Sequence, residues 1–230
     1  MSQFPAITIS RSLGSGGTEV GFLVSRLLGW HFCDRRILRL VSEILGQSTA
    51  SLARLEEHHQ GYLEKLFSLF AMGTPEATYT PPIEIPMYSR ELFDLESKVI
   101  FKLLQHAPSV VMGRGGFITL RDRAATLHVS IHSDLAFRIQ TLVGRGKAPN
   151  QDAARQAIIS SDQDRAAFIK EISGLDWHDP KHFHIVLDVS KYGYEACAKM
   201  IEDEFYRHFP FEFPVQRRGP EDEISQSILE

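Results

Sequence analysis

The stretch that decides the fold is Ala6-Ile7-Thr8-Ile9-Ser10-Arg11-Ser12-Leu13-Gly14-Ser15-Gly16-Gly17-Thr18, in which an apolar run of β character leads into a glycine-rich turn. This order is typical of a phosphate-binding loop, G-x-x-x-x-G-K-[ST], whose backbone N–H groups hold phosphate oxygens at the start of a helix. Gly16 and Thr18 match the last Gly and the Ser/Thr, but Gly17 takes the position of the Lys and Arg11 that of the first Gly. The sequence therefore predicts the phosphate cradle without its usual lysine.

The turn supplies the residues predicted to bind a nucleotide, which are Gly14, Ser15, Gly16, Gly17 and Thr18. Its glycines permit the close backbone approach and the positive φ that an anion nest requires, and the Thr18 hydroxyl is predicted to reach a phosphate-bound Mg²⁺. A glycine-rich β–α turn without a ligand is the alternative. A dinucleotide-binding fingerprint fits worse, because Gly14-Ser15-Gly16 has no glycine three residues after the second one.

Composition sets the class of protein. A chain of 230 residues with 43% hydrophobic and 23% charged residues predicts one globular domain. The formal charge of −4 gives no support for binding nucleic acid or a membrane through net charge. Two cysteines make no disulfide framework, and no stretch approaches the ~18 apolar residues of a membrane span. We therefore expect a cytoplasmic protein that binds neither nucleic acid nor membranes.

Short apolar runs alternate with amphipathic repeats along the chain. Strands are predicted at 6–10, 31–33, 109–112, 126–131 and 183–189, and helices at 17–28, 35–45, 48–71, 90–105, 134–142, 150–172 and 192–208. This alternation predicts an α/β fold with a mostly parallel sheet and helices on both faces. The loops that begin at residues 11, 34 and 113 then emerge at one rim of the sheet, where ligands of such folds bind.

The domain is predicted to span residues 1–209, followed by a poorly ordered tail at 210–230 that is rich in Pro, Glu, Arg and Gly. The wide apolar face of the predicted helix at 48–71 needs a partner surface, either the core or a second copy in a homodimer. Prolines at 73–89 predict an exposed loop.

Several segments together carry a family resemblance: residues 7–21, 32–38, 111–116, 137–138, 161–165 and 177–180. Over about residues 5–208 the chain resembles the cytidylate-kinase-like family of P-loop kinases. The resemblance implies the nucleoside-monophosphate-kinase fold, a three-layer sandwich around an about five-stranded parallel sheet with a helical insert at about 48–105 and a lid at about 144–170. It also implies ATP and Mg²⁺ as cofactors and transfer of the γ-phosphoryl group to CMP or dCMP.

Phosphoryl transfer needs positive charge near the developing charge on oxygen, so the replacement for the missing lysine matters. Arg11 is the first candidate, because a guanidinium can bind two phosphate oxygens; a salt-bridged loop arginine is an equal alternative. Arg114, set between glycines, resembles the Gly-Arg-Asp segment with which cytidylate kinases hold the monophosphate, although Gly115 replaces the Asp. A structural turn arginine is the alternative there.

Further roles follow from the resemblance. Asp34 matches an Asp that helps to recognise the nucleoside, although a helix N-cap explains it equally well, and Arg35 is a candidate phosphate contact. Arg145 and Arg165 flank the predicted lid and are candidate catalytic cations that reach the transferred phosphate on closure. Asp162 and Asp164 are expected to orient these arginines.

Two functional hypotheses remain. The first is ATP-dependent phosphorylation of a small acceptor, nominally (d)CMP, with the nucleotide and that acceptor as the protein's partners. The second is a catalytically silent nucleotide sensor that engages a partner protein. The lost lysine leaves both open.

Overall fold

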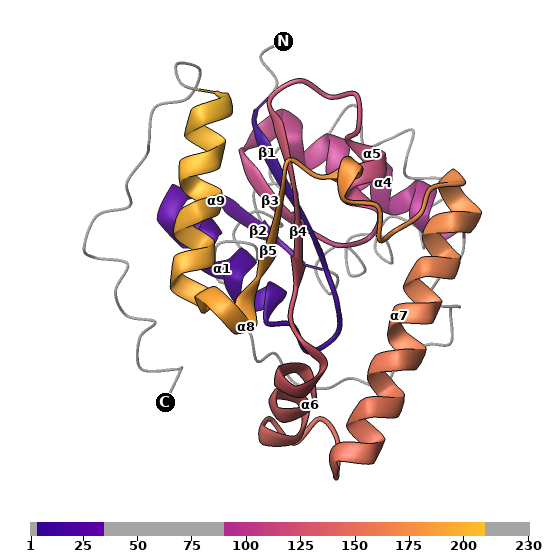
Figure 1. Ribbon diagram of the computed structural model, residues 1–230. Helices are drawn as coiled ribbons and strands as arrows, with labels where there is room; N and C mark the ends of the chain where they lie inside the picture. The colour runs from indigo at the N-terminus through magenta and orange to yellow at the C-terminus, as the bar shows by residue number, and fades with distance from the viewer. Residues whose placement is uncertain (1–3, 35–89, 210–230) are drawn as a thin grey trace.

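The computed structural model describes residues 4–34 and 90–209 (Figure 1). The predicted helices at 35–45 and 48–71, the loop at 73–89 and the tail at 210–230 lie outside the described residues, and so does the predicted dimer surface. The division into one domain, an insert and a tail therefore stays a prediction. Within the described part, no helix is long and apolar enough to span a membrane.

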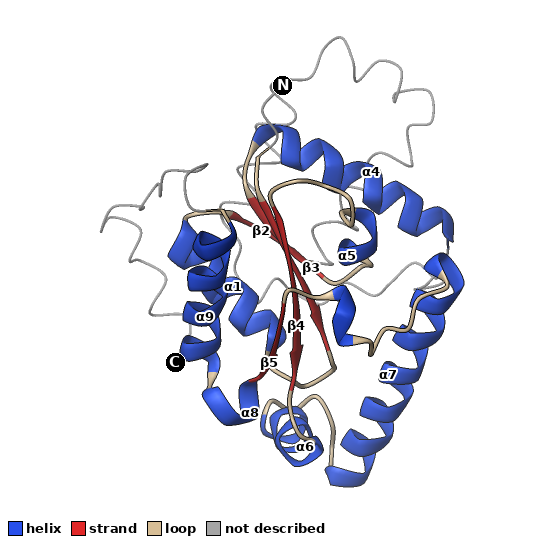
Figure 2. Cartoon of the chain, turned by 45° about the horizontal axis from the view of Figure 1, so that its top comes forward, coloured by secondary structure: helices blue, strands red, loops and turns tan. Residues whose placement is uncertain are grey.

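A five-stranded parallel sheet forms the centre of the molecule (Figure 2). Its strands are β1 (Ala6–Arg11), β2 (His31–Cys33), β3 (Ser109–Met112), β4 (Thr126–His132) and β5 (Ile185–Asp188), in the spatial order β2-β3-β1-β4-β5. Ile7 of the central strand pairs with Val110 on one side and Leu127 on the other. The first five residues of β1 are buried, as expected of a strand covered on both faces.

Helices cover both faces of the sheet, which makes three layers (Figures 1 and 2). On one face, α1 (Gly17–Leu28) packs against α9 (Tyr194–His208), and their apolar stripes share a core with β1, β3, β4 and β5. On the other face, α4 (Arg90–His106) packs on β3, and the short α5 (Gly116–Thr119) packs on β1. The predicted α/β three-layer fold is confirmed.

Two helices pack against each other beside the carboxyl ends of the central strands, α6 (Leu135–Gly144) and α7 (Gln151–Ser173) (Figure 1). Asp134 caps α6 by accepting a hydrogen bond from the backbone N of Phe137 at 2.7 Å, and Asn150 caps α7 by accepting one from Ala153 at 2.9 Å. A single 3₁₀ turn, η1 (Pro180–His182), leads from α7 to β5.

The carboxyl-terminal part differs from the sequence prediction in two places. The last strand covers Ile185–Asp188 where 183–189 was predicted, and it ends at Asp188 because this carboxylate accepts a hydrogen bond from Ser190 N and starts the short α8 (Val189–Tyr192). The single helix predicted at 192–208 is interrupted at Gly193, whose φ of 78° and ψ of 172° separate α8 from α9.

Candidate functional site

The glycine-rich turn joins β1 to the amino terminus of α1. Gly14 and Gly16 both have a φ of 77°, a left-handed conformation that strains any residue with a Cβ. Gly16 is the N-cap of α1, and within the described residues no side chain caps this helix end. Thr18 follows with an exposed side chain. The backbone N–H groups at this end, and the positive end of the helix dipole, can therefore bind an anion.

The turn is held in shape by one of its own side chains and by two from elsewhere in the chain. The buried Ser15 hydroxyl donates to the carbonyl of Ser12 at 2.9 Å, and Ser133, just after β4, donates to the carbonyl of Ser15 at 3.1 Å. A Cβ on Gly16 would lie 2.2 Å from Cε1 of Tyr194, so the turn packs directly on that ring. The Ser15 side chain therefore shapes the loop and points away from solvent.

Arg11 crosses the position at which the pattern places the lysine. A Cβ on Gly17 would lie only 2.5 Å from the Cβ of Arg11 and 2.9 Å from its Cγ. The guanidinium reaches the end of β3, since a Cβ on Gly113 would lie 1.8 Å from Arg11 Nη1. Two glycines, one on each neighbouring loop, thus make room for one arginine. Its charge lies between the glycine-rich turn and the turn at residues 113–116.

A pocket opens beside this guanidinium, between the ends of β1 and β3, α7 and the loop before η1. Arg11, Arg114 and Arg165 give it positive charge, and Phe117, Phe168 and Trp177 give it apolar walls. The rest of its lining consists of Thr8, Ile9, Ser10, Gly113, Gly115, Gly116 and Ile169. Such a pocket suits a small anion that carries an apolar or planar body.

Arg114 lies in a strained turn and is paired. Gly113, Arg114 and Gly115 have φ values of 67°, 52° and 62°, and a positive φ is uncommon for a residue other than glycine. Its Nη2 lies 3.0 Å from Oε1 of Glu96 on α4, and both side chains are buried. The ion pair fixes Arg114 at the pocket wall.

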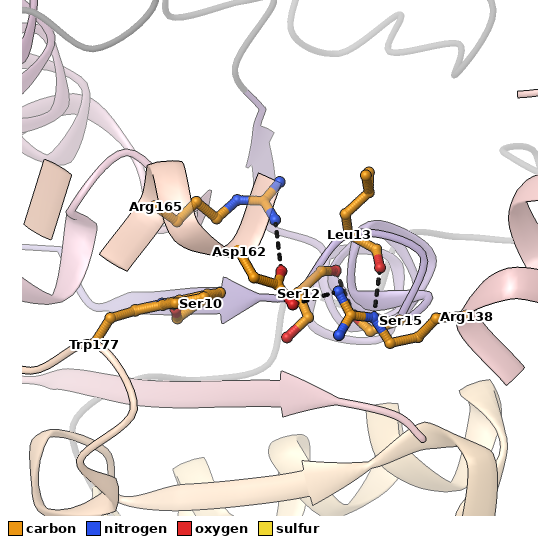
Figure 3. Close-up of polar contacts among 8 residues, drawn as sticks. All are labelled: Ser10, Ser12, Leu13, Ser15, Arg138, Asp162, Arg165 and Trp177. Carbon is orange, nitrogen blue, oxygen red and sulfur yellow. Dashed lines mark hydrogen bonds and ion pairs between the residues drawn. The ribbon is translucent and has the colours of Figure 1, made fainter. Parts of the chain in front are cut away.

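Arg165 reaches the pocket from α7 and lies 3.6 Å from Oδ1 of Asp162 (Figure 3). Asp162 also accepts a hydrogen bond from Arg138 at 2.7 Å. Across the pocket, Trp177 Nε1 donates to the Ser10 hydroxyl at 2.8 Å, which ties the loop before η1 to the end of β1. Of the two acids expected to orient arginines, Asp162 does so, whereas Asp164 is exposed.

Behind the pocket, Thr8 is hydrogen-bonded to a buried histidine of β4. Thr8 Oγ1 lies 2.8 Å from His128 Nδ1, and the backbone N of His128 donates to Nδ1 of His184 at 2.8 Å. Burial, together with the neighbouring His184, lowers the pKa of His128 to about 4. The imidazole is therefore neutral near neutral pH.

Arg145 and Asp34 are not among the described residues that line this pocket. Arg145, just after α6, is ion-paired with Glu19 of α1 and is partly exposed. Asp34 is half-buried after β2. Arg35 lies outside the described residues. Three of the predicted arginines thus converge on one pocket, and Arg145 lies on the α1 side of the loop.

The sequence predicted no role at the site for Ser10, Glu96 or Trp177. Glu96 had a signal, because it falls on the apolar face of the predicted helix with Val99, Ile100 and Leu103, all of them buried. A carboxylate on such a face needs a buried cation. Ser10 and Trp177 lie in segments that carry the family resemblance, but their contact had no signal, since it joins residues far apart in the chain.

Comparison with known proteins agrees with the geometry. The model of the cytidylate kinase-like family matches residues 6–191, whereas no curated protein matches the chain. Among solved structures, an uncharacterized protein from Eubacterium ventriosum ATCC 27560 is 14% identical with a TM-score of 0.64, over 87% of this chain and 98% of that one.

Two enzymes also align with most of the chain. A shikimate kinase from Acinetobacter baumannii, in complex with shikimate, is 16% identical with a TM-score of 0.45, over 87% of this chain and 92% of that one. A gluconokinase from Sinorhizobium meliloti 1021 is 14% identical with a TM-score of 0.44, over 90% and 99%. The family model covers most of this sequence, and the chain belongs to the cytidylate kinase-like family.

Proposed function

We propose that this protein transfers a phosphoryl group from ATP, with Mg²⁺, to a small anionic acceptor, nominally CMP or dCMP. The observation that carries the proposal is the path of Arg11, whose stem lies over Gly17 and whose guanidinium lies against Gly113. A cation there faces both the phosphate loop and the pocket. Charge stabilisation and positioning are the main demands of phosphoryl transfer, so an arginine in this place can take over the work of the lysine.

The nucleotide is proposed to bind at the turn. The left-handed Gly14 and Gly16 and the amino terminus of α1 present backbone N–H groups to its phosphates, and Ser15 keeps the turn in shape. The exposed hydroxyl of Thr18 fits a ligand of Mg²⁺, which prefers oxygen. When bound, Mg²⁺ neutralises phosphate charge. Gly17 contributes its N–H and leaves room for Arg11.

The acceptor is proposed to bind in the pocket, with its anionic group between Arg114 and Arg165 and its body against Phe117 and Trp177. This arrangement places the acceptor on the side of Arg11 opposite the turn. Asp34 and Arg35 are proposed to contact the acceptor from the segment after β2. Arg145 is proposed to approach the transferred phosphate only when the segment at 144–170 closes.

The proposal is tested by incubating the purified protein with Mg²⁺, ATP and each of CMP, dCMP and UMP, and measuring the ADP formed. Acceptor-dependent ADP release with at least one of them is expected. The proposal is abandoned if the protein binds ATP but releases no ADP with these or other small hydroxyl or phosphate acceptors.

That last outcome defines the second candidate function, a silent nucleotide sensor. The observation that favours it is Gly17, since the loop lacks the lysine of its pattern. A sensor predicts nucleotide binding without turnover and an oligomeric state that changes with nucleotide. Light scattering with and without Mg·ATP distinguishes it from the kinase.

A further inference from the structure

A continuous set of polar contacts joins the phosphate loop to the pocket. It runs from the Leu13 carbonyl through Arg138 and Asp162 to Arg165 (Figure 3). The first residue belongs to the turn, the second to α6 and the last two to α7. One end lies at the proposed nucleotide site, and the other lies at the proposed acceptor site.

At the loop end, Arg138 touches the turn twice. Its Nε donates to the carbonyl of Leu13 at 2.7 Å. Its own carbonyl lies against Gly14, where a Cβ would approach to 2.9 Å. The conformation of the turn and the position of Arg138 therefore depend on each other.

At the centre, Asp162 lies between two guanidinium groups. Oδ2 accepts from Arg138 at 2.7 Å, whereas Oδ1 lies 3.6 Å from Arg165, a distance that suits an ion pair but is too long for a hydrogen bond. The side chains of Arg138, Asp162 and Arg165 are 10%, 24% and 21% exposed, so solvent screens the three charges only in part.

At the pocket end, Arg165 lies farther from the Asp162 carboxylate than Arg138 does. The charge of Asp162 attracts the guanidinium at the wall of the pocket, where Arg165 is one of the lining residues. A neutral side chain at residue 162 would remove the negative charge that lies between these two like charges, and their repulsion would then act against the present positions of both.

We propose that Asp162 is a positioning residue that serves both sites, because it holds Arg138 on the turn and Arg165 at the pocket. The inference rests on the proposed function. Removal of its charge should weaken the binding of nucleotide at the loop and of an anion in the pocket together. In this arrangement the position of Arg138 on the turn and the position of Arg165 at the pocket both depend on a single carboxylate on α7.

The test uses the full chain and two probes. Mg²⁺ with the non-hydrolysable ATP analogue AMP-PNP is titrated by calorimetry, and sulfate is then titrated into the AMP-PNP-loaded protein at constant ionic strength. Asp162→Asn keeps the shape of the side chain and an acceptor for Arg138 but loses the charge. We expect each affinity to fall about fivefold or more, as a charge-assisted contact gives way to a neutral one.

Three further variants separate this role from a general loss of structure. Asp164→Asn removes the exposed carboxylate two residues away and should change neither affinity. Asp162→Glu restores the charge and should recover both. Arg165→Gln should weaken sulfate binding alone. If Asp162→Asn lowers the unfolding temperature, Arg138→Lys replaces it, because a lysine keeps the charge but cannot bond Leu13 and Asp162 in the same geometry.

The inference is overturned if Asp162→Asn leaves either affinity within about twofold of the wild type. It is also overturned if Asp164→Asn has the same effect, if Asp162→Glu recovers neither affinity, or if sulfate fails to bind the AMP-PNP-loaded wild type. A wild-type protein that does not bind AMP-PNP at all contradicts the proposed function itself, which is a different result.

Discussion

Gly17 and Arg11 are a matched pair, since the side chain of one occupies the space that a side chain on the other would need. Comparison of the sequence with the loop pattern shows only that the lysine is missing. The geometry adds that a lysine at residue 17 and an arginine at residue 11 exclude each other. The positive charge is therefore supplied from the end of β1, by Arg11, instead of from the start of α1, where the pattern has its lysine.

This exclusion predicts that Gly17→Ala changes the free energy of unfolding in opposite directions in two backgrounds. Gly17→Ala should destabilise the wild type by about 1–3 kcal/mol, because the new Cβ overlaps the stem of Arg11. In an Arg11→Gly background the same change should stabilise by up to ~1 kcal/mol, because alanine favours the helix. Urea unfolding of the four proteins measures the cycle. Equal effects of Gly17→Ala in both backgrounds would contradict the overlap.

Glu96 and Arg114 form a buried ion pair whose partners cannot be removed singly without cost. Glu96→Gln should lower the free energy of unfolding by about 3 kcal/mol, because a buried guanidinium loses its counter-charge. The control is Asp94→Asn, an exposed position on the same helix that should change it by less than ~0.5 kcal/mol. Denaturant unfolding measures both. A loss in Glu96→Gln no larger than in the control would show that the pair does not hold the turn.

At the level of elements, β1 and β4 are joined by a buried polar contact as well as by their hydrogen-bond ladder. Thr8 on β1 bonds His128 on β4, and His184, just before β5, accepts from the backbone of His128. Burial favours the neutral imidazole of His128, so we expect the folded protein to lose stability in acid, where this imidazole must bind a proton.

The pKa of His128 is about 4 in the folded protein and near 6.5 when unfolded, so the unfolded chain binds more protons between these values. Stability is full above about pH 7 and should fall by about 3 kcal/mol on lowering the pH to about 4. His128→Asn should flatten this part of the pH profile, whereas the exposed His178→Gln should not. Thermal unfolding between these pH values gives the profile. A profile unchanged by His128→Asn would contradict the assignment.

For the molecule as a whole, the sequence was most informative where structure is local. The strand, turn and helix at 6–28 follow from a buried apolar run, glycines that permit positive φ and a 3.6-residue repeat, and each depends on neighbours in the chain. The parallel sheet follows from the alternation of elements. The break at Gly193 was missed, because a glycine inside a helical pattern does not by itself give its conformation.

The pocket was predicted only in part, because it is assembled from segments far apart. Arg11, Arg114 and Arg165 were candidates on residue type and on the family resemblance. Their convergence depends on the order β2-β3-β1-β4-β5, which places the ends of β1 and β3 side by side. The contact of Trp177 with Ser10 spans 167 residues and has no sequence pattern. Arg145 carried the same signal as Arg165, yet it faces Glu19 instead.

The central claim is that Arg11 does the work of the missing lysine, and turnover of the Arg11→Ala variant tests it most directly. ADP release with Mg·ATP and the best acceptor is measured beside the unfolding temperature, and Arg155→Ala, an exposed arginine on α7, is the control. We predict that turnover falls by about 100-fold or more in Arg11→Ala, with folding retained, and is unchanged in the control. Turnover in Arg11→Ala equal to that of the wild type would contradict the claim.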